Sequence, residues 1–279
     1  MPLPQALVRA VAEERDPRRT AWLEALPGLV AALAGRWSVT PGPPFRPGGR
    51  TAWVAPAGRD LVLKVGWRHP EDEHEADGLR AWAGAGAVAV HATWRDATTS
   101  ALLLERCRPG TPLGALRSGP EQDVVLADLL RRLWRPAGPP FRPLAELCDL
   151  WADGVERDPP PLDPGLLRAG LELFRALPRA SDERFLLVTD LHAGNVLAHG
   201  DGWGLIDPKP YVGDRCYDVL QHLLNEPSRT TTDPHGTVRR LADLTGLDRE
   251  RTLLWAFARA VVESAWSPWV RPVAVALAP

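Results

Sequence analysis

Short apolar runs bounded by turn-forming residues predict several strands in the first hundred residues. The clearest run is LVLKV at 61–65, which lies between AGRD and GWRHP. Residues 51–54, 88–94 and 101–104 form similar runs. Before them, apolar residues at helical spacing predict a helical region over 4–35, with Thr20 as a candidate N-cap and Pro27 as a bend or break. The N-terminal part should therefore combine helices with a small sheet.

A further helix is predicted after Pro70, because proline suits the first helical position. Acidic residues at 71–73 favour the positive end of the helix dipole. Glu71, Glu75, Leu79 and Trp82 then recur at the spacing of one helical face, and glycines at 84 and 86 end the pattern. The pattern predicts that Glu75 shares a face with apolar residues.

The pattern changes after the connector ERCRPGTPLG at 105–114. Helical spacing dominates 116–134, 144–154, 164–177 and the chain after Asp214, where Trp255 and Trp266 are predicted core residues. One hairpin interrupts the helices, with strands at 196–198 and 203–206 around the turn HGDG. We therefore expect an α+β protein with two lobes and a cleft at the connector. The predicted parts are a sheet-rich N-terminal lobe (1–104), a hinge (105–110) and a mainly helical C-terminal lobe (111–279).

Composition narrows the function classes. Net charge is −2, so no basic field is available to recruit nucleic acid. The three cysteines are far apart and form no CxxC pair, which favours a reducing compartment over a disulfide framework or a zinc site. No apolar run approaches a membrane span, and no signal peptide is visible, so a cytoplasmic protein without a membrane partner is expected. Of the 33 basic residues only Lys64 and Lys209 are lysines.

Candidate chemistry concentrates in VTDLHAGNVLAHGDGWGLIDPKP, residues 188–210. Phosphoryl transfer needs a cation on the phosphates, oxygen ligands for Mg²⁺ and a carboxylate that accepts the hydroxyl proton. Lys64 lies in a predicted strand, and Glu75 follows on a helix. Asp190 and Asn195 flank a short loop, and the hairpin returns Asp207 toward Asn195. The order of these residues suits a kinase that acts on a hydroxyl group.

Four longer segments carry a family resemblance: VLKVGWRHPEDEHEADGLRAW (62–82), ALLLERCRPGTPL (101–113), DLHAGNVL (190–197) and LIDPKPYVGDRCYDVLQHLLN (205–225). Together they resemble the aminoglycoside phosphotransferase superfamily, and within it the streptomycin and hydroxyurea kinases, or aminoglycoside/hydroxyurea antibiotic resistance kinases. The resemblance covers most of residues 50–225. It implies a bilobed, protein-kinase-like fold.

The resemblance also implies roles for individual residues. Lys64, paired with Glu75, would grip the nucleotide phosphates, and Asp190 would be the catalytic aspartate. Asn195 and Asp207 would be the Mg²⁺ ligands.

Other positions follow from the same resemblance. The backbone of Glu105, Arg106 and Cys107 would bind adenine, Gly48 and Gly49 in PGGRT would form a short phosphate loop, and Asp218 would brace the catalytic loop. Val188 and Thr189 depart from the His-Gly that the family usually has before the catalytic aspartate.

Three hypotheses about function follow. The first is a kinase that uses ATP, or alternatively GTP, to phosphorylate a hydroxyl of a streptomycin-type aminoglycoside or hydroxyurea and so confers resistance. The second is a metabolic small-molecule kinase acting on an amino sugar. The third is a nucleotide-binding pseudokinase. Testing nucleotide consumption against a panel of such acceptors would separate them.

The acceptor is expected to be a small, cationic molecule. Asp190, Asp207, Asp214 and Asp218 fall within 29 residues, and Mg²⁺ would offset only part of their charge. Asp218, as a buried brace, adds little to this charge. Candidate acceptor-contacting residues are Asp214, Glu226, Asp233, Glu263 and Trp269.

Overall fold

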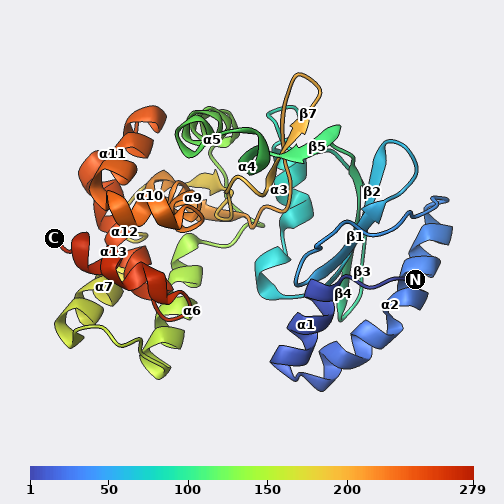
Figure 1. Cartoon of the computed structure of the whole chain (residues 1–279), viewed down its shortest axis with the longest axis horizontal. Coiled ribbons are helices and arrows are strands. Elements are labelled where there is room, and N and C mark those ends of the chain that lie inside the picture. Colours follow the sequence, from blue (N-terminus) through green and yellow to red (C-terminus); the bar gives the residue numbers. More distant parts are fainter. The chain divides into compact units, whose positions relative to one another are not determined.

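The structure, a computed structural model, describes all residues from Met1 to Pro279. The chain divides into two compact units. The first comprises Met1–Ala83, Ala87–Gly110 and Ala198–Gly204, and the second comprises Gly84–Gly86, Thr111–Leu197 and Leu205–Pro279. The helices and strands of both are labelled in Figure 1. None of the helices combines the length and the apolar character that crossing a membrane requires.

A four-stranded antiparallel sheet in the order β1-β2-β4-β3 is the centre of the first unit. Its strands are β1 (Ala52–Pro56), β2 (Leu61–Trp67), β3 (Val90–Arg95) and β4 (Thr99–Glu105). The helices of this unit are α1 (Gln5–Glu14), α2 (Pro17–Arg36) and α3 (Glu75–Ala81), with a 3-10 turn at Pro70–Asp72. Lys64 lies in the middle of β2, opposite Val54 on β1 and Leu102 on β4.

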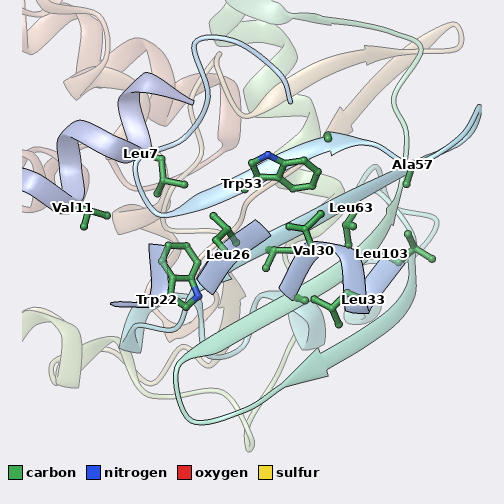
Figure 2. Packing of buried hydrophobic residues seen from close by; sticks show 13 residues of the cluster. Leu7, Val11, Trp22, Leu26, Val30, Leu33, Trp53, Ala57, Leu63 and Leu103 are labelled. Atoms are coloured by element: carbon green, nitrogen blue, oxygen red, sulfur yellow. The ribbon is translucent and has the colours of Figure 1, made fainter. Parts of the chain in front are cut away.

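Helices α1 and α2 pack on one face of this sheet and form its core with it (Figure 2). Leu63 and Val65 of β2 are fully buried in this cluster. Because side chains alternate between the two faces of a strand, Lys64 is directed to the opposite face. The core therefore fixes the direction in which the lysine side chain leaves the sheet. The remaining side chains of the cluster are Leu7, Val11, Trp22, Leu26, Val30, Leu33, Trp53, Ala55, Ala57, Ala101 and Leu103.

The predicted cap of the second helix is wrong, and so is one of the two alternatives for Pro27. Asp16, rather than Thr20, caps α2 by accepting a hydrogen bond from the backbone N–H of Arg18 at 2.8 Å. The helix also continues through Pro27, so the proline does not divide it. Packing of its apolar face on the sheet offsets the backbone hydrogen bond that proline cannot make.

Helices dominate the second unit. The longer ones are α5 (Gly119–Leu133), α6 (Leu144–Arg157), α7 (Pro164–Ala176), α11 (Pro234–Thr245) and α12 (Arg249–Glu263). The shorter ones are α4 (Leu113–Leu116), α8 (Arg215–Asp218), α9 (Leu220–Leu224), α10 (Pro227–Thr232) and α13 (Arg271–Ala276), with a 3-10 turn at Pro268–Val270. This agrees with the helical pattern predicted after residue 116.

Short strands frame the loops that carry the candidate chemistry. β5 (Pro109–Pro112), β7 (Val196–His199) and β8 (Gly202–Leu205) form a three-stranded sheet in the order β5-β7-β8. β6 (Phe185–Leu187) and β9 (Tyr211–Gly213) pair antiparallel, with Leu187 opposite Tyr211. The β7–β8 hairpin was predicted. The strands β5, β6 and β9 were not, because three or four residues are too few to show a period.

An aromatic cluster lies in the core of the second unit. The rings of Tyr217 and Trp255 meet edge to face with centroids 5.2 Å apart, and Phe174 packs on Trp255 at 6.1 Å. Trp255 is fully buried, as predicted. The prediction for Trp266 is wrong, because it is 56% exposed and packs edge to face on Trp151 beyond the end of α12.

Candidate active site

Lys64 and Glu75 form a buried ion pair in the first unit. The Nζ of Lys64 lies 2.7 Å from both carboxylate oxygens of Glu75. The side chains are 12% and 3% exposed, respectively. Glu75 is the first residue of α3, where the helix dipole favours a carboxylate. The predicted face is present from Glu75 onward, with Leu79 and Trp82 fully buried, whereas Glu71 belongs to the preceding 3-10 turn.

The glycines predicted to contact phosphate lie in a loop that joins two paired segments. Phe45 donates its backbone N–H to Val54 of β1 at 2.9 Å, so the loop 46–51 connects an edge segment to β1. Gly48 has a φ of +84°, a conformation that favours glycine, and a Cβ added there would lie 2.5 Å from the Cβ of Pro4. The sequence PGGRT is thus a tight turn held against the N-terminal segment.

The predicted hinge follows directly from β4. The carboxylate of Glu105 accepts the backbone N–H of Ala89 at 3.0 Å and lies 3.2 Å from Nε2 of His199. The backbone N–H of Arg106 is donated to the carbonyl of Asp60 at 2.9 Å. Cys107 is buried, and burial raises the pKa of its thiol to about 11, so the thiol stays protonated at neutral pH. These contacts fix the hinge backbone on both sides.

The loop that carries Asp190 begins where β6 ends. The β6–β9 ladder continues past its last pair, because the N–H of Lys209 donates to the carbonyl of Val188 at 3.0 Å. The buried carboxylate of Asp218 accepts the N–H groups of Val188 at 3.0 Å and Thr189 at 2.6 Å, and Nε1 of Trp134 at 2.9 Å. Burial raises the pKa of Asp218 to about 6, against these three donors. Asp218 thus hydrogen-bonds the backbone directly before Asp190, which is the position that the predicted bracing role requires.

The continued ladder brings Lys209 to Asp190. The Nζ of Lys209 lies 2.8 Å from Oδ2 of Asp190, and the two side chains are 22% and 21% exposed. Sequence reasoning did not foresee this pair, because it depends on the three-residue strands β6 and β9. Composition offered a hint, because the chain has only two lysines. Both prove to be paired with a carboxylate of the candidate site.

Asn195 and Asp207 are brought together by the β7–β8 hairpin. The backbone N–H of Ile206 donates to the carbonyl of Asn195 at 2.9 Å, which makes Asp207 the next residue along. The Nδ2 of Asn195 donates to the carbonyl of Asp190 at 3.0 Å, so a metal-binding role would fall to its Oδ1. Amide and carboxylate oxygens are ligands that Mg²⁺ prefers, and this pair therefore fits such an ion. Asp207 adopts a φ of +52°, an uncommon conformation for a residue with a side chain.

The predicted acceptor-contacting residues are scattered. Asp214 is buried, caps α8, and accepts Nε of Arg251 at 2.6 Å and Nε1 of Trp255 at 2.7 Å. It holds the core together rather than facing an acceptor. The electrostatic argument for a cationic acceptor consequently loses force, because Asp190 is paired with Lys209 and Asp214 with Arg251.

The other candidates lie on the later helices. Asp233 is exposed and caps α11 through the N–H of Gly236 at 2.9 Å. Glu263 ends α12 and accepts Nη1 of Arg259 at 2.6 Å. Glu226 is half-buried before α10, and Trp269 is half-buried in the last 3-10 turn.

Comparisons with known proteins agree with this geometry. A family model described as aminoglycoside/hydroxyurea antibiotic resistance kinase matches residues 36–270. Streptomycin 6-kinase of Streptomyces griseus is 32% identical over an alignment that covers 95% of this chain and 90% of that protein. Hydroxyurea phosphotransferase of Kitasatospora aureofaciens is 35% identical over 257 residues, which cover 88% and 74%, respectively.

A solved structure extends the comparison to the fold. An aminoglycoside phosphotransferase from Streptomyces rimosus, in complex with ADP and streptomycin, superimposes with a TM-score of 0.56. The alignment covers 91% of this chain and 98% of that chain at 18% identity. The protein-kinase-like fold predicted from the sequence is therefore confirmed.

Proposed function

Because the chain belongs to the aminoglycoside/hydroxyurea antibiotic resistance kinase family and is a phosphotransferase with a hydroxyl acceptor, we propose that it uses ATP to phosphorylate and so inactivate an antibiotic. The proposed acceptor is a streptomycin-type aminoglycoside or hydroxyurea. The observation that carries the proposal is the identity of 32% and 35% with relatives that bear these activities in their names, over most of the chain.

Nucleotide binding is assigned to the first unit. Lys64 would place its ammonium on the α- and β-phosphates, because Glu75 holds it at 2.7 Å on the face of β2 opposite the core. The turn at Gly48 and Gly49 would offer backbone N–H groups to the phosphates. The hinge at 105–107 would bind adenine through its backbone. We also expect Lys64 to approach Asp207, so that the phosphates lie between the ammonium and the proposed Mg²⁺ ligand.

The transfer step is assigned to the loops of the second unit. Asp190 would accept the proton of the acceptor hydroxyl as the bond from that oxygen to the γ-phosphorus forms. The bond from the γ-phosphorus to the bridging oxygen breaks at the same centre, and ADP leaves. Asn195 and Asp207 would hold Mg²⁺, which when bound supplies positive charge to the phosphates. Orientation of Asn195 by the carbonyl of Asp190 supports this division of roles.

Acceptor recognition is assigned to the later helices. A streptomycin-type acceptor carries guanidinium groups, and carboxylates would pair with them. Glu226, Asp233 and Glu263 are the acids proposed for this role, with Trp269 as an aromatic contact. Asp214 is left out, because its carboxylate is buried in the core, where it accepts hydrogen bonds from Arg251 and Trp255.

The test measures nucleotide consumption with ATP and with GTP against streptomycin, hydroxyurea and a neutral amino-sugar panel. The wild type should turn over ATP with streptomycin or hydroxyurea. Asp190→Asn should keep the fold and lower kcat by ~10²-fold or more, because the hydroxyl loses its base. Turnover restricted to amino sugars would replace the antibiotic by a metabolic acceptor. A wild-type rate in the Asp190→Asn variant would remove Asp190 from the catalytic role.

A further inference from the structure

The second lysine of the chain lies on the carboxylate proposed as the catalytic base. Lys209 Nζ is 2.8 Å from Oδ2 of Asp190, a hydrogen-bonded ion pair. Both side chains are about one-fifth exposed, at 22% and 21%. A ligand can therefore reach the pair. The proposed base is therefore already bound to a cation at the position that the acceptor hydroxyl has to reach.

The backbone around Lys209 is held as firmly as its side chain. Its N–H donates to the carbonyl of Val188 at 3.0 Å, and its carbonyl accepts the hydroxyl of Thr189. Thr189 in turn donates its N–H to the buried Asp218 at 2.6 Å. The two loops are thus joined by backbone and side chain just before Asp190.

Thr189 adopts an uncommon conformation to make this link. Its φ is +53°, in the left-handed region where a β-branched residue is strained. Glycine would adopt the same backbone without strain but would have no hydroxyl for the carbonyl of Lys209. The threonine is therefore explained by the hydrogen bond that it gives to Lys209.

From these contacts we propose that Lys209 is a positioning residue for Asp190 and also cancels the negative charge that the acceptor would otherwise meet there. Its ammonium holds the carboxylate in the orientation that receives the hydroxyl proton, and Thr189 holds Lys209. Because this ammonium neutralises the carboxylate, the pair gives guanidinium and ammonium groups of the acceptor no net attraction at the base. The inference rests on the proposed function, because it needs Asp190 as the base.

The kinetic signature separates kcat from KM. Lys209→Met leaves Asp190 with a mobile, unpaired carboxylate, so kcat should fall by at least ~10-fold with streptomycin and with hydroxyurea. An unpaired carboxylate attracts cations, and one such charge pair in water changes binding by ~5-fold. The KM for streptomycin should fall by about that factor, whereas the KM for neutral hydroxyurea should not fall. A purely structural role would impair both acceptors alike.

Matched variants complete the experiment. Lys209→Arg keeps the charge and should recover most of kcat. Arg249→Met removes one cation from an exposed pair with Asp243 and should change neither constant. Thr189→Val removes only the hydroxyl and should lower kcat less than Lys209→Met does. Thr189→Val should add little further loss when combined with Lys209→Met, because both act on one contact.

Each outcome decides the proposal. Wild-type kinetics in Lys209→Met, or a streptomycin KM that rises as much as the hydroxyurea KM, would overturn it. If the wild type phosphorylates neither acceptor, the proposed function fails. Urea unfolding of Asp190→Asn, Lys209→Met and the double variant then tests whether Lys209 and Asp190 interact. Midpoint shifts that do not add support the pair, and additive shifts refute it.

Discussion

The ion pair of Lys64 and Glu75 allows a quantitative prediction about stability. The charged groups are 2.7 Å apart, which corresponds to ~6 kcal/mol of attraction at an effective dielectric constant near 20. Removing both groups from water costs several kcal/mol each, so the net contribution of the intact pair is near zero. Removing only one partner breaks this buried pair. Glu75→Leu alone should therefore destabilise the fold by about 3–5 kcal/mol.

The assay is urea unfolding followed by tryptophan fluorescence, on both single variants and on Lys64→Met/Glu75→Leu. The destabilisation by Glu75→Leu should lie at the lower end of the range of about 3–5 kcal/mol, because the Lys64 side chain is 12% exposed and can reach some water. The double variant should recover most of the loss, since a matched apolar pair replaces a matched charged one. It should remain inactive, because no ammonium is left for the phosphates.

A control pair tests whether burial of the charged groups, rather than the short distance between them, causes the predicted loss of stability. Arg50 and Glu13 are also 2.7 Å apart, but their side chains are 65% and 60% exposed. Glu13→Leu should consequently cost less than about 1 kcal/mol. The reasoning would be refuted by a Glu75→Leu variant that unfolds at the wild-type midpoint, or by a double variant less stable than either single one.

Two further predictions concern other carboxylates of the second unit. Asp207→Ala should weaken binding of Mg²⁺–ATP by at least ~10-fold in calorimetry, and an unaltered affinity would argue against its metal role. Burial raises the pKa of Asp123, but hydrogen bonds from His222, Arg229 and Arg240 outweigh it and hold the pKa well below its ordinary value. Because this folded pKa is depressed, Asp123 stabilises the protein fully above the unfolded pKa near ~3.9 and loses this effect as pH falls further. The difference in unfolding free energy between wild type and Asp123→Asn should thus shrink below about pH 4, and a difference independent of pH would contradict the assignment.

The parts of the site predicted from sequence are those that local rules determine. Lys64 could be placed because LVLKV is a clear strand, and the direction of its side chain follows from the buried Leu63 and Val65. Asn195 and Asp207 could be brought together because HGDG is a recognisable hairpin turn. In each case a few neighbouring residues contain the necessary information.

The parts that were missed depend on pairing between distant short segments. Lys209 meets Asp190 through the β6–β9 ladder, whose strands have three residues each and show no period. Asp214 appeared to be an acceptor-contacting acid, but its partner Arg251 is 37 residues away on α12. Trp266 fell in helical spacing with Trp255, yet α12 ends at Glu263 and leaves the ring exposed. Sequence spacing alone does not report where a helix stops.

The packing of α1 and α2 on the sheet has a consequence for how such enzymes are delimited and engineered. The family model begins at residue 36, whereas α2 ends at Arg36 and α1 precedes it. A chain trimmed to the matched region would lose Leu7, Trp22 and Leu26 and uncover the apolar face of β1, β2 and β4 (Figure 2). Uncovered sheet faces of this kind promote association between chains. The recognisable family region is therefore shorter than the unit that folds, and libraries or chimaeras of these kinases should exchange the N-terminal helices together with the sheet that they cover.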